Sequence, residues 1–383
     1  MTKPNLLIAT DNFLPRWDGI ARFLYEIIPD LTDKYNVTVL APNFGKYKPK
    51  GFRLVKIKKS KFGLGDYIAP KFSYRAIQRE VKKADIVFTQ TIGPIGMLSI
   101  ICAKQKKKKL ATFIHSLEWE LVPMATKNLL LRRILSPLTK LFTRILYNKP
   151  DLLILPSSFL ADALAWRGIN TKKFVATLGV NCSVFKPLSE RSDVEKKEIL
   201  SLKKDLGLED SFVVGNHGRL ANEKDLSTLI RGFQWFRKKH KNAKLLVIGD
   251  GLSNIKEKLS KTKGCIHISS KNDVYKYLNL MDVYVTSSLT ETTSLTTLEA
   301  MASGLVVIST PVGFIKEYIS PRTTGLFFKP KNSFDLFKKL DLVKTDSVKS
   351  SRMSINARKL VIDDFQWRNT SDNIKEALDS LNF

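Results

Sequence analysis

Two glutamates eight positions apart, Glu291 and Glu299, are the residues of this sequence best suited to gripping a hydroxyl-rich ligand. They flank a predicted helix start, because the apolar strand candidate 283–285 is followed by good helix formers over 295–301. Polar residues that can cap a helix lie between them: Thr292, Thr293 and Ser294. The free N–H groups and partial positive charge of such a helix start favour an anion, best a phosphate. Eight helical residues span about 12 Å, which is too far for two carboxylates to share a proton but suits two hydroxyl-bearing parts of one long ligand.

The same residues also fit a purely structural pattern. Thr296 and Glu299 have the spacing of a capping box, in which the two side chains close the helix start themselves. The spacing alone leaves both interpretations open.

A second candidate site follows the strand 212–215. Gly218 and Arg219 lie in the loop after this strand, and Lys224 precedes a helix that is expected to begin at about residue 226. A Gly-bearing loop with two cations before a helix is a phosphate site by geometry and charge. The alternative is an ordinary pair of surface bases.

The stretch 286–304, together with the strand and the Pro311-Val312-Gly313 loop after it, resembles the group 1 family of retaining glycosyltransferases. That family has the two-domain fold called GT-B. The resemblance implies that Glu291 acts at the donor sugar and that Glu299 holds the ribose of the nucleotide. It also implies that Arg219 and Lys224, in the pattern Gly-Arg-x-x-x-x-Lys, bind the donor diphosphate.

The residues between the two glutamates carry further implied roles. Thr292 and Thr293 stand beside the donor sugar, and the backbone amides at Ser294 and Leu295 complete the diphosphate site. The sequence departs from the family here, because Thr-Thr-Ser at 292–294 replaces a commoner apolar residue followed by Gly.

The N-terminal half offers two candidates of its own. Gly19 lies in the loop after strand 5–10, where a glycine lets the backbone approach a ligand or simply makes a turn. His115 ends the strand candidate 110–114, at the edge where ligands of open parallel sheets bind. A lone histidine is usually structural. The resemblance, however, implies that His115 is catalytic beside the donor sugar and that Gly19 faces the donor phosphate and the acceptor, although the family often has paired glycines where this chain has Asp18-Gly19.

Positive charge is concentrated in the first half of the chain. Residues 1–185 contain 31 Lys and Arg against 12 Asp and Glu, so +19 of the net +28 falls there. A charge of this size suits a polyanionic partner, either an anionic membrane or nucleic acid. A lysine-rich surface from an AT-rich genome is the alternative, but such a bias should affect both halves equally.

One predicted helix shows how that charge could be used. No acid occurs from 121 to 150, and on a helical projection two stripes form about 115° apart. The apolar stripe contains Leu130, Ile134, Leu138, Leu141 and Ile145, and the basic stripe contains Arg133, Lys140 and Arg144. This pattern is typical of a helix in a membrane interface, and it also fits a surface helix whose apolar stripe faces the core. Lipid-acting members of the family carry such a helix in their N-terminal domain.

These patterns predict an α/β protein with two Rossmann-like, doubly wound domains facing a cleft. The expected boundaries are 1–185 for an acceptor-binding domain and 186–365 for a nucleotide-sugar-binding domain. Residues 366–383 are expected to form a helix that, as in the family, crosses back to the first domain.

The predicted function is retaining glycosyl transfer, of the hexosyltransferase type, from a nucleotide-diphosphate sugar to a hydroxyl acceptor. A lipid or lipid-linked glycan is the preferred acceptor, as in glycolipid or cell-envelope glycan synthesis; a soluble or polysaccharide acceptor remains open. So do an epimerase or hydrolase of the same fold and a basic nucleic-acid-binding protein. The sequence lacks RNA-binding signatures, so no nucleic acid partner is expected.

Other features of the sequence indicate whether a metal is used and in which compartment the protein works. No two Asp residues lie two apart, so no Asp-x-Asp metal site exists, and neither metal nor cofactor is expected. Three distant cysteines favour a reducing compartment. No apolar segment reaches about 18 residues. We therefore expect a cytoplasmic protein, peripheral on the inner face of the cell membrane.

Overall fold

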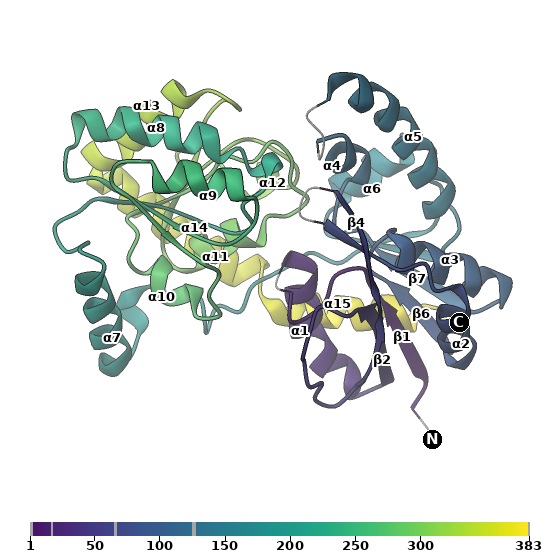
Figure 1. Cartoon of the computed structure of the whole chain (residues 1–383). Helices are drawn as coiled ribbons and strands as arrows, with labels where there is room; N and C mark the ends of the chain where they lie inside the picture. The colour runs from purple at the N-terminus through teal and green to yellow at the C-terminus, as the bar shows by residue number, and fades with distance from the viewer. Residues whose placement is uncertain (1–2, 17, 65–66, 125–127, 382–383) are drawn as a thin grey trace. The chain divides into compact units, whose positions relative to one another are not determined.

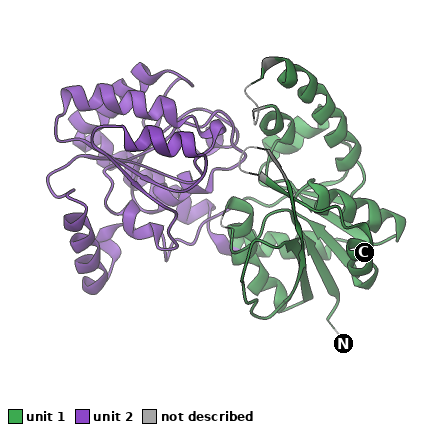
Figure 2. Ribbon diagram, viewed as in Figure 1, with its two compact units in different colours: residues 1–177, 369–383 green, residues 178–368 purple. Residues whose placement is uncertain are grey.

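A computed structural model describes residues 3–16, 18–64, 67–124 and 128–381. The chain forms two compact units, shown in different colours in Figure 2. The first unit comprises residues 1–177 and 369–383, and the second comprises residues 178–368.

The first unit is built on a seven-stranded sheet in which every neighbouring pair is parallel, in the order β3-β2-β1-β6-β7-β8-β9. The strands of this sheet are β1 (Asn5–Ala9), β2 (Asn36–Pro42), β3 (Arg53–Ile57), β6 (Ile86–Thr89), β7 (Lys109–Phe113), β8 (Leu152–Leu155) and β9 (Lys173–Val175). An antiparallel hairpin of β4 (Lys59–Leu64) and β5 (Tyr67–Pro70) is separate from it. The strand order reverses between β1 and β6, and ligands of such sheets bind at this switch point.

The helices of the first unit connect these strands (Figure 1). They are α1 (Gly19–Thr32), α2 (Tyr74–Lys83), α3 (Pro94–Gln105), α4 (Glu118–Met124), α5 (Leu129–Tyr147), α6 (Ser158–Ala165) and most of α15 (Trp367–Asp379). The inner strands are mostly apolar, as in the buried run Leu152–Leu155, because helices cover both faces of a parallel sheet.

The second unit repeats this plan with a six-stranded parallel sheet in the order β12-β11-β10-β13-β14-β15. Its strands are β10 (Val213–His217), β11 (Lys244–Ile248), β12 (Cys265–Ile268), β13 (Val283–Thr286), β14 (Val306–Ser309) and β15 (Leu326–Phe327). Its helices are η1 (Leu188–Glu190), α7 (Asp193–Asp205), η2 (Asn222–Lys224), α8 (Leu226–Lys239), α9 (Ser253–Ser260), α10 (Val274–Leu278), α11 (Leu295–Ala302), α12 (Ile315–Tyr318), α13 (Ser333–Thr345) and α14 (Ser347–Asp364). The switch point lies between β10 and β13, so the two loops singled out from the sequence flank it.

The last helix, α15, packs into the first unit. Its side chains Ile374, Ala377 and Leu378 are fully buried. Tyr35 donates a hydrogen bond of 2.9 Å to Asp379, and Ser371 donates one of 2.5 Å to Asp30. The predicted fold class is thus confirmed, including a C-terminal helix that returns to the first unit.

Candidate functional site

The start of α11 lies at the switch point of the second unit. Ser294 is the N-cap and adopts a left-handed conformation (φ +60°), and the helix begins at Leu295. The Ser294 hydroxyl lies 2.8 Å from that of Thr297 and, within the described chain, does not cap the backbone. The first N–H groups of α11 therefore have no side-chain cap, which suits an anion. The capping-box alternative is wrong, because Thr296 is already the second residue of the helix.

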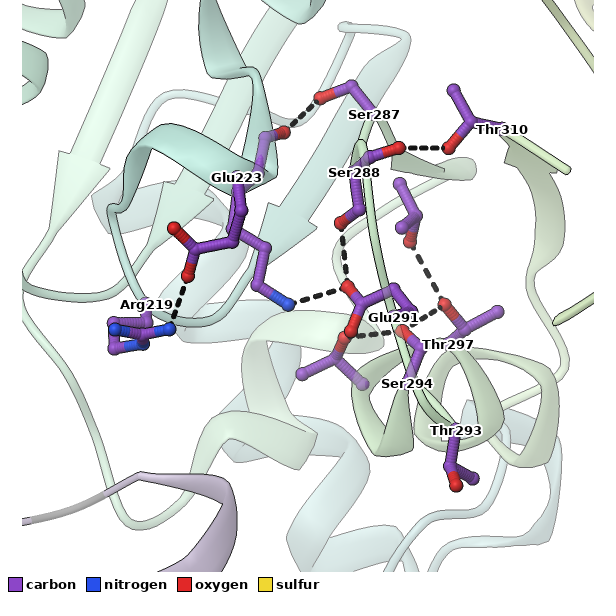
Figure 3. Close-up of polar contacts among 12 residues, drawn as sticks. Arg219, Glu223, Ser287, Ser288, Glu291, Thr293, Ser294, Thr297 and Thr310 are labelled. Atoms are coloured by element: carbon purple, nitrogen blue, oxygen red, sulfur yellow. Dashed lines mark hydrogen bonds and ion pairs between the residues drawn. The ribbon is translucent and has the colours of Figure 1, made fainter. Parts of the chain in front are cut away.

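Two loops of the second unit are joined through an ion pair. The Nζ of Lys224 lies 2.5 Å from Oε1 of Glu291, and the Ser288 hydroxyl donates to the same oxygen at 2.6 Å. The Ser287 hydroxyl donates to the carbonyl of Lys224 at 2.8 Å. Figure 3 shows these contacts between the β13–α11 loop and the loop after β10. The predicted diphosphate ligand Lys224 and the predicted sugar ligand Glu291 are thus brought together.

The second predicted cation, Arg219, is also held by a carboxylate, that of Glu223 (Figure 3). Glu223 in turn accepts a backbone hydrogen bond of 2.7 Å from Leu289. Each cation therefore stands beside an acid of its own unit. Neither Glu223 nor Ser288 stands out in the sequence, since only the folded loops show which acid faces which base.

Glu299, the predicted ribose ligand, is 0% exposed. Its Oε2 lies 2.6 Å from Nε2 of His217, the last residue of β10. The His217 ring lies beside Tyr284, with centroids 5.4 Å apart, and the Tyr284 hydroxyl donates to the His217 carbonyl at 3.1 Å. Sequence reasoning missed His217; its one signal was a histidine directly before Gly218-Arg219 at the end of a strand. The ribose role of Glu299 stays a prediction.

A neighbouring glycine turn fixes the backbone of the sugar-site candidates. Gly313 has φ +53°, and a Cβ there would lie 1.7 Å from the carbonyl oxygen of Glu291, so only glycine fits. Phe314 N–H donates to the Thr292 carbonyl at 3.0 Å, and the Tyr318 hydroxyl donates to the Thr293 carbonyl at 2.7 Å. The Thr293 side chain is buried, and its hydroxyl has no hydrogen-bond partner among the described residues. Figure 3 shows this side chain apart from the Glu291 carboxylate.

In the first unit, His115 follows β7 in an aromatic setting. The Phe113 and Phe23 rings lie 4.4 Å and 4.9 Å from its ring. Its Nε2–H donates to Oε1 of Gln90 at 2.8 Å. Burial lowers the pKa of His115 from 6.5 to about 3. The imidazole is therefore neutral at neutral pH and can exchange hydrogen bonds with a hydroxyl, but it does not act as a cationic acid.

Gly19 is the first residue of α1, and its neighbour Asp18 caps that helix. Oδ1 of Asp18 accepts hydrogen bonds from Ile20 N–H at 3.0 Å and from Ala21 N–H at 2.9 Å. A Cβ added to Gly19 would meet nothing within 4 Å. The fold therefore does not require glycine here. The aspartate that replaces a family glycine occupies two of the N–H groups that a phosphate would use.

Glu118, three residues after His115, is a partly buried carboxyl to which the sequence assigns no role. It accepts hydrogen bonds from the Tyr147 hydroxyl at 2.7 Å and from the Ser116 hydroxyl at 3.1 Å. Burial raises the pKa of Glu118 from 4.5 to about 7. Its protonated form is favoured in the folded protein.

We predict that the wild type becomes less stable between pH 5 and 8 because of Glu118, and that the variant Glu118→Gln lacks this decrease in stability. The folded state binds this proton more tightly than the unfolded state, so the contribution of Glu118 is present below pH 4.5 and is lost as the pH rises through about 7. Urea unfolding should give equal stabilities for both proteins at pH 5. At pH 8 the variant should be more stable by on the order of 2–3 kcal/mol. Parallel stability curves from pH 5 to 8 would contradict the assignment.

The helix α5 turns both of its predicted stripes to solvent. The five residues of its apolar stripe are between 52% and 70% exposed. The basic residues Arg133, Lys140 and Arg144 are exposed as well. The buried face instead contains Thr139, Thr143, Leu146 and Tyr147. The alternative in which the apolar stripe packs on the core is therefore wrong, and contact with a membrane stays a prediction.

No three His, Cys, Asp or Glu side chains of the described chain gather as metal ligands do. No helix in that part of the chain is both long and apolar enough to cross a membrane.

Two doubly wound parallel units, the second with basic residues and a helix start at its switch point, make up the fold called GT-B. The chain belongs to the group 1 glycosyltransferases. The model of "Glycosyl transferases group 1" matches residues 199–360, and that of "Glycosyltransferase Family 4" matches residues 17–184. The predictions of family, fold and enzyme class are confirmed.

Two curated relatives match over about 70% of their length. The α-monoglucosyldiacylglycerol synthase of Streptococcus pneumoniae is 23% identical over 339 residues, which cover 84% of this chain and 74% of the relative. The enzyme of the same name from Acholeplasma laidlawii is 26% identical over 291 residues, which cover 73% and 68%.

Solved structures share the fold. Anabaena Alr3699/HepE, in complex with UDP and glucose, superposes with a TM-score of 0.81 at 17% identity and covers 98% of this chain and 100% of that one. WaaG, a glycosyltransferase involved in lipopolysaccharide biosynthesis, gives a TM-score of 0.75 at 17% identity, with 98% and 99% covered.

Proposed function

We propose that this glycosyltransferase moves a sugar, with retention of configuration, from a nucleotide diphosphate to the hydroxyl of a membrane lipid or lipid-linked sugar. The observation that carries the proposal is the gathering of Arg219, Lys224, Glu291 and the start of α11 at the switch point of the second unit. The first unit would bind the acceptor and the second unit the donor.

The ion pairs at this site indicate how a diphosphate would bind. A diphosphate carries the same kind of charge as the carboxylates of Glu291 and Glu223, which now face Lys224 and Arg219. On binding, the phosphate oxygens would take over these cations together with the N–H groups at the start of α11. Glu291 would then be released to accept a hydrogen bond from a hydroxyl of the donor sugar.

The proposed chemical step uses the leaving group as the base. The bond from the sugar C1 to the phosphate oxygen breaks, and a bond from C1 to the acceptor oxygen forms on the same face. The proton of the acceptor hydroxyl passes to the departing phosphate. Arg219, Lys224 and the helix start stabilise the charge that develops on the diphosphate, so we propose that no divalent ion or cofactor is required.

A lipid acceptor is supported by two observations. Both curated relatives described above are named monoglucosyldiacylglycerol synthases. The solvent-facing apolar and basic stripes of α5 have the composition of an interfacial helix. We propose that the first unit docks through α5 on the anionic inner face of the cell membrane, with the protein otherwise in the cytoplasm.

Transfer of labelled sugar tests this function directly. Nucleotide sugars that raise the thermal stability of the protein would be labelled and incubated with it and with vesicles of diacylglycerol or monoglycosyldiacylglycerol. Label in the lipid fraction supports the proposal. Label that reaches only water indicates a hydrolase, an altered nucleotide sugar without transfer indicates an epimerase, and label on a soluble glycan alone removes the lipid acceptor.

Glu299→Ala should cost the protein both stability and donor binding. The side chain is fully buried against His217, so its removal leaves a buried imidazole without its charged partner, which typically costs about 1–3 kcal/mol. Binding of the nucleotide sugar, measured by calorimetry below the melting temperature, should fall because the proposed acceptor of the ribose hydroxyls is gone. Normal donor affinity in a destabilised variant would leave Glu299 a structural role only.

Gly19→Ala should lower kcat/KM about tenfold or more without lowering stability. The added methyl group meets nothing within 4 Å in the protein, and alanine is favoured over glycine in a helix. A loss of activity would therefore report a ligand that approaches this backbone. Unchanged kinetics in a variant that melts at or above the wild-type temperature would make Gly19 a simple turn residue.

A further inference from the structure

Two aromatic side chains on α6 and at its end face solvent. Trp166 is 90% exposed, the largest fraction among the large hydrophobic side chains of the described chain, and Phe159 is 52% exposed. Trp166 is the C-cap of α6 and keeps helical backbone angles. Seven helical residues bring two side chains to within about 20° of the same face, about 10 Å apart. Leu160 and Leu164 bury the other face of α6, so Phe159 and Trp166 form an aromatic edge without a partner in the described chain.

This aromatic edge adjoins the C-terminal end of α5. The side-chain amide of Asn148, the C-cap of α5, donates to the carbonyl of Gly168 at 2.9 Å. The backbone N–H of Asn170 donates back to Asn148 at 2.8 Å. Gly168 has φ +72°, and a Cβ there would lie 2.9 Å from the Arg144 guanidinium. Trp166 thus stands two residues from a turn that touches the basic stripe of α5, and the two surfaces are continuous.

Charge on this surface favours an anionic partner. Exposed bases surround the turn: Arg144, Arg167 and Lys172. Arg167 also lies over the ring of Trp119, at 4.9 Å. One acid, Asp162, lies on the exposed side of α6 between the two aromatics. Exposed indole and phenyl rings beside basic residues match the headgroup region of an anionic bilayer, where tryptophan is enriched because its ring is apolar and its N–H is polar.

We propose that Phe159 and Trp166 form a second contact with the anionic bilayer, beside α5. A single helix lying on a membrane leaves the unit free to rotate about the helix axis. An aromatic contact at the side of that axis stops the rotation and fixes which face of the first unit meets the lipid. This inference rests on the proposed membrane docking of α5 and adds the residues that set its orientation.

Binding to vesicles without donor or acceptor tests the proposal. Vesicles of phosphatidylglycerol and phosphatidylcholine would be titrated with the wild type, Trp166→Ala and Phe159→Ala. Trp235→Ala is the matched control, because Trp235 is 47% exposed but lies on α8 in the second unit. Inserting an indole removes on the order of 100 Å² of apolar surface from water, so Trp166→Ala should bind on the order of 50-fold more weakly. The ratio of the wild-type affinity to the Trp166→Ala affinity should be the same at high salt, because the difference between the two proteins does not arise from charge.

Fluorescence gives a second readout. The emission of Trp166, obtained as the difference between the wild type and Trp166→Phe, should shift to the blue on vesicles and be quenched by lipids with brominated chains. Wild-type affinity in Trp166→Ala, an equal loss in Trp235→Ala, or emission that vesicles do not change would overturn the inference. Because no sugar transfer is measured, these outcomes stay separate from the test of the enzyme: a variant that binds normally while the wild type glycosylates lipid refutes the aromatic contact alone.

Discussion

Replacing Lys224 by alanine should lower turnover about 10²–10³-fold, the usual effect of losing one stabiliser of developing charge. The side chain already stands 2.5 Å from a carboxylate, so the folded loops hold an anion at this place. Arg219→Ala should have an effect of similar size, since Arg219 is held in the same way by Glu223. Single-turnover rates at saturating nucleotide sugar would measure both effects.

Lys276→Ala provides a matched control for the Lys224 variant. Lys276 is also an ion-paired lysine of the second unit, 2.9 Å from Glu198, and its side chain is 26% exposed against 25% for Lys224. It should leave turnover unchanged. Activity that disappears with a chelator and returns with a divalent ion would contradict a site that works through these cations alone.

Reversing the basic stripe of α5 should release the protein from anionic vesicles. The variant combines Arg133→Glu, Lys140→Glu and Arg144→Glu. Each base near such a surface contributes about 1 kcal/mol, and each reversal also adds repulsion, so sedimentation at low salt should show binding weakened more than about 100-fold. Affinity for the nucleotide sugar should stay unchanged, because none of the donor-site candidates of either unit lies on α5.

A second triple variant tests whether the loss of vesicle binding comes from the position of the reversed charges or only from the change in net charge. Three exposed lysines at the end of α9 and just after it, in the second unit, give the same change in net charge: Lys258→Glu, Lys261→Glu and Lys263→Glu. This control should still bind vesicles. If the wild type itself stays in the supernatant at low salt, docking on the membrane fails and a soluble glycan becomes the better acceptor.

Local patterns predicted the sheets and the motifs, because each depends on residues close in sequence. Strands that are buried on both faces appear in the sequence as short apolar runs. The glycine and helix-cap residues that follow these runs indicate where the ligand-binding loops lie. The pairs Lys224–Glu291 and His217–Glu299 could not be predicted, since their partners are 67 and 82 residues apart and meet only through the register of β10 with β13. The helix starts at Leu295 as the helix formers over 295–301 predict, but propensity does not indicate the left-handed conformation of Ser294 before it.

The helix α5 shows a limit of a different kind. The helical periodicity of the sequence locates the apolar and the basic stripe of α5 correctly. It does not indicate which face of the helix packs against the core. Thr139 and Thr143 lie on the buried face, while Leu130, Leu138 and Leu141 point outward. Their hydroxyls bond to backbone carbonyls one turn earlier in the same helix, Thr139 to Leu135 at 2.7 Å and Thr143 to Lys140 at 3.0 Å, which makes them acceptable inside. A surface helix normally packs its apolar face against the core, and α5 does the opposite. This orientation is recognised only from the folded chain.

The place of α15 determines the order in which the two units can be completed during synthesis. Residues 369–383 leave the ribosome after the whole second unit, yet they belong to the first unit, where Ile374, Ala377 and Leu378 are fully buried. All residues of the second unit, 178–368, are synthesised before the segment of α15 that completes the first unit. N-terminal domains generally fold first as a chain is made. In this protein the apolar surface under α15 is synthesised before the second unit and is covered only after it, so a nascent chain keeps this surface open to chaperones until α15 has left the ribosome.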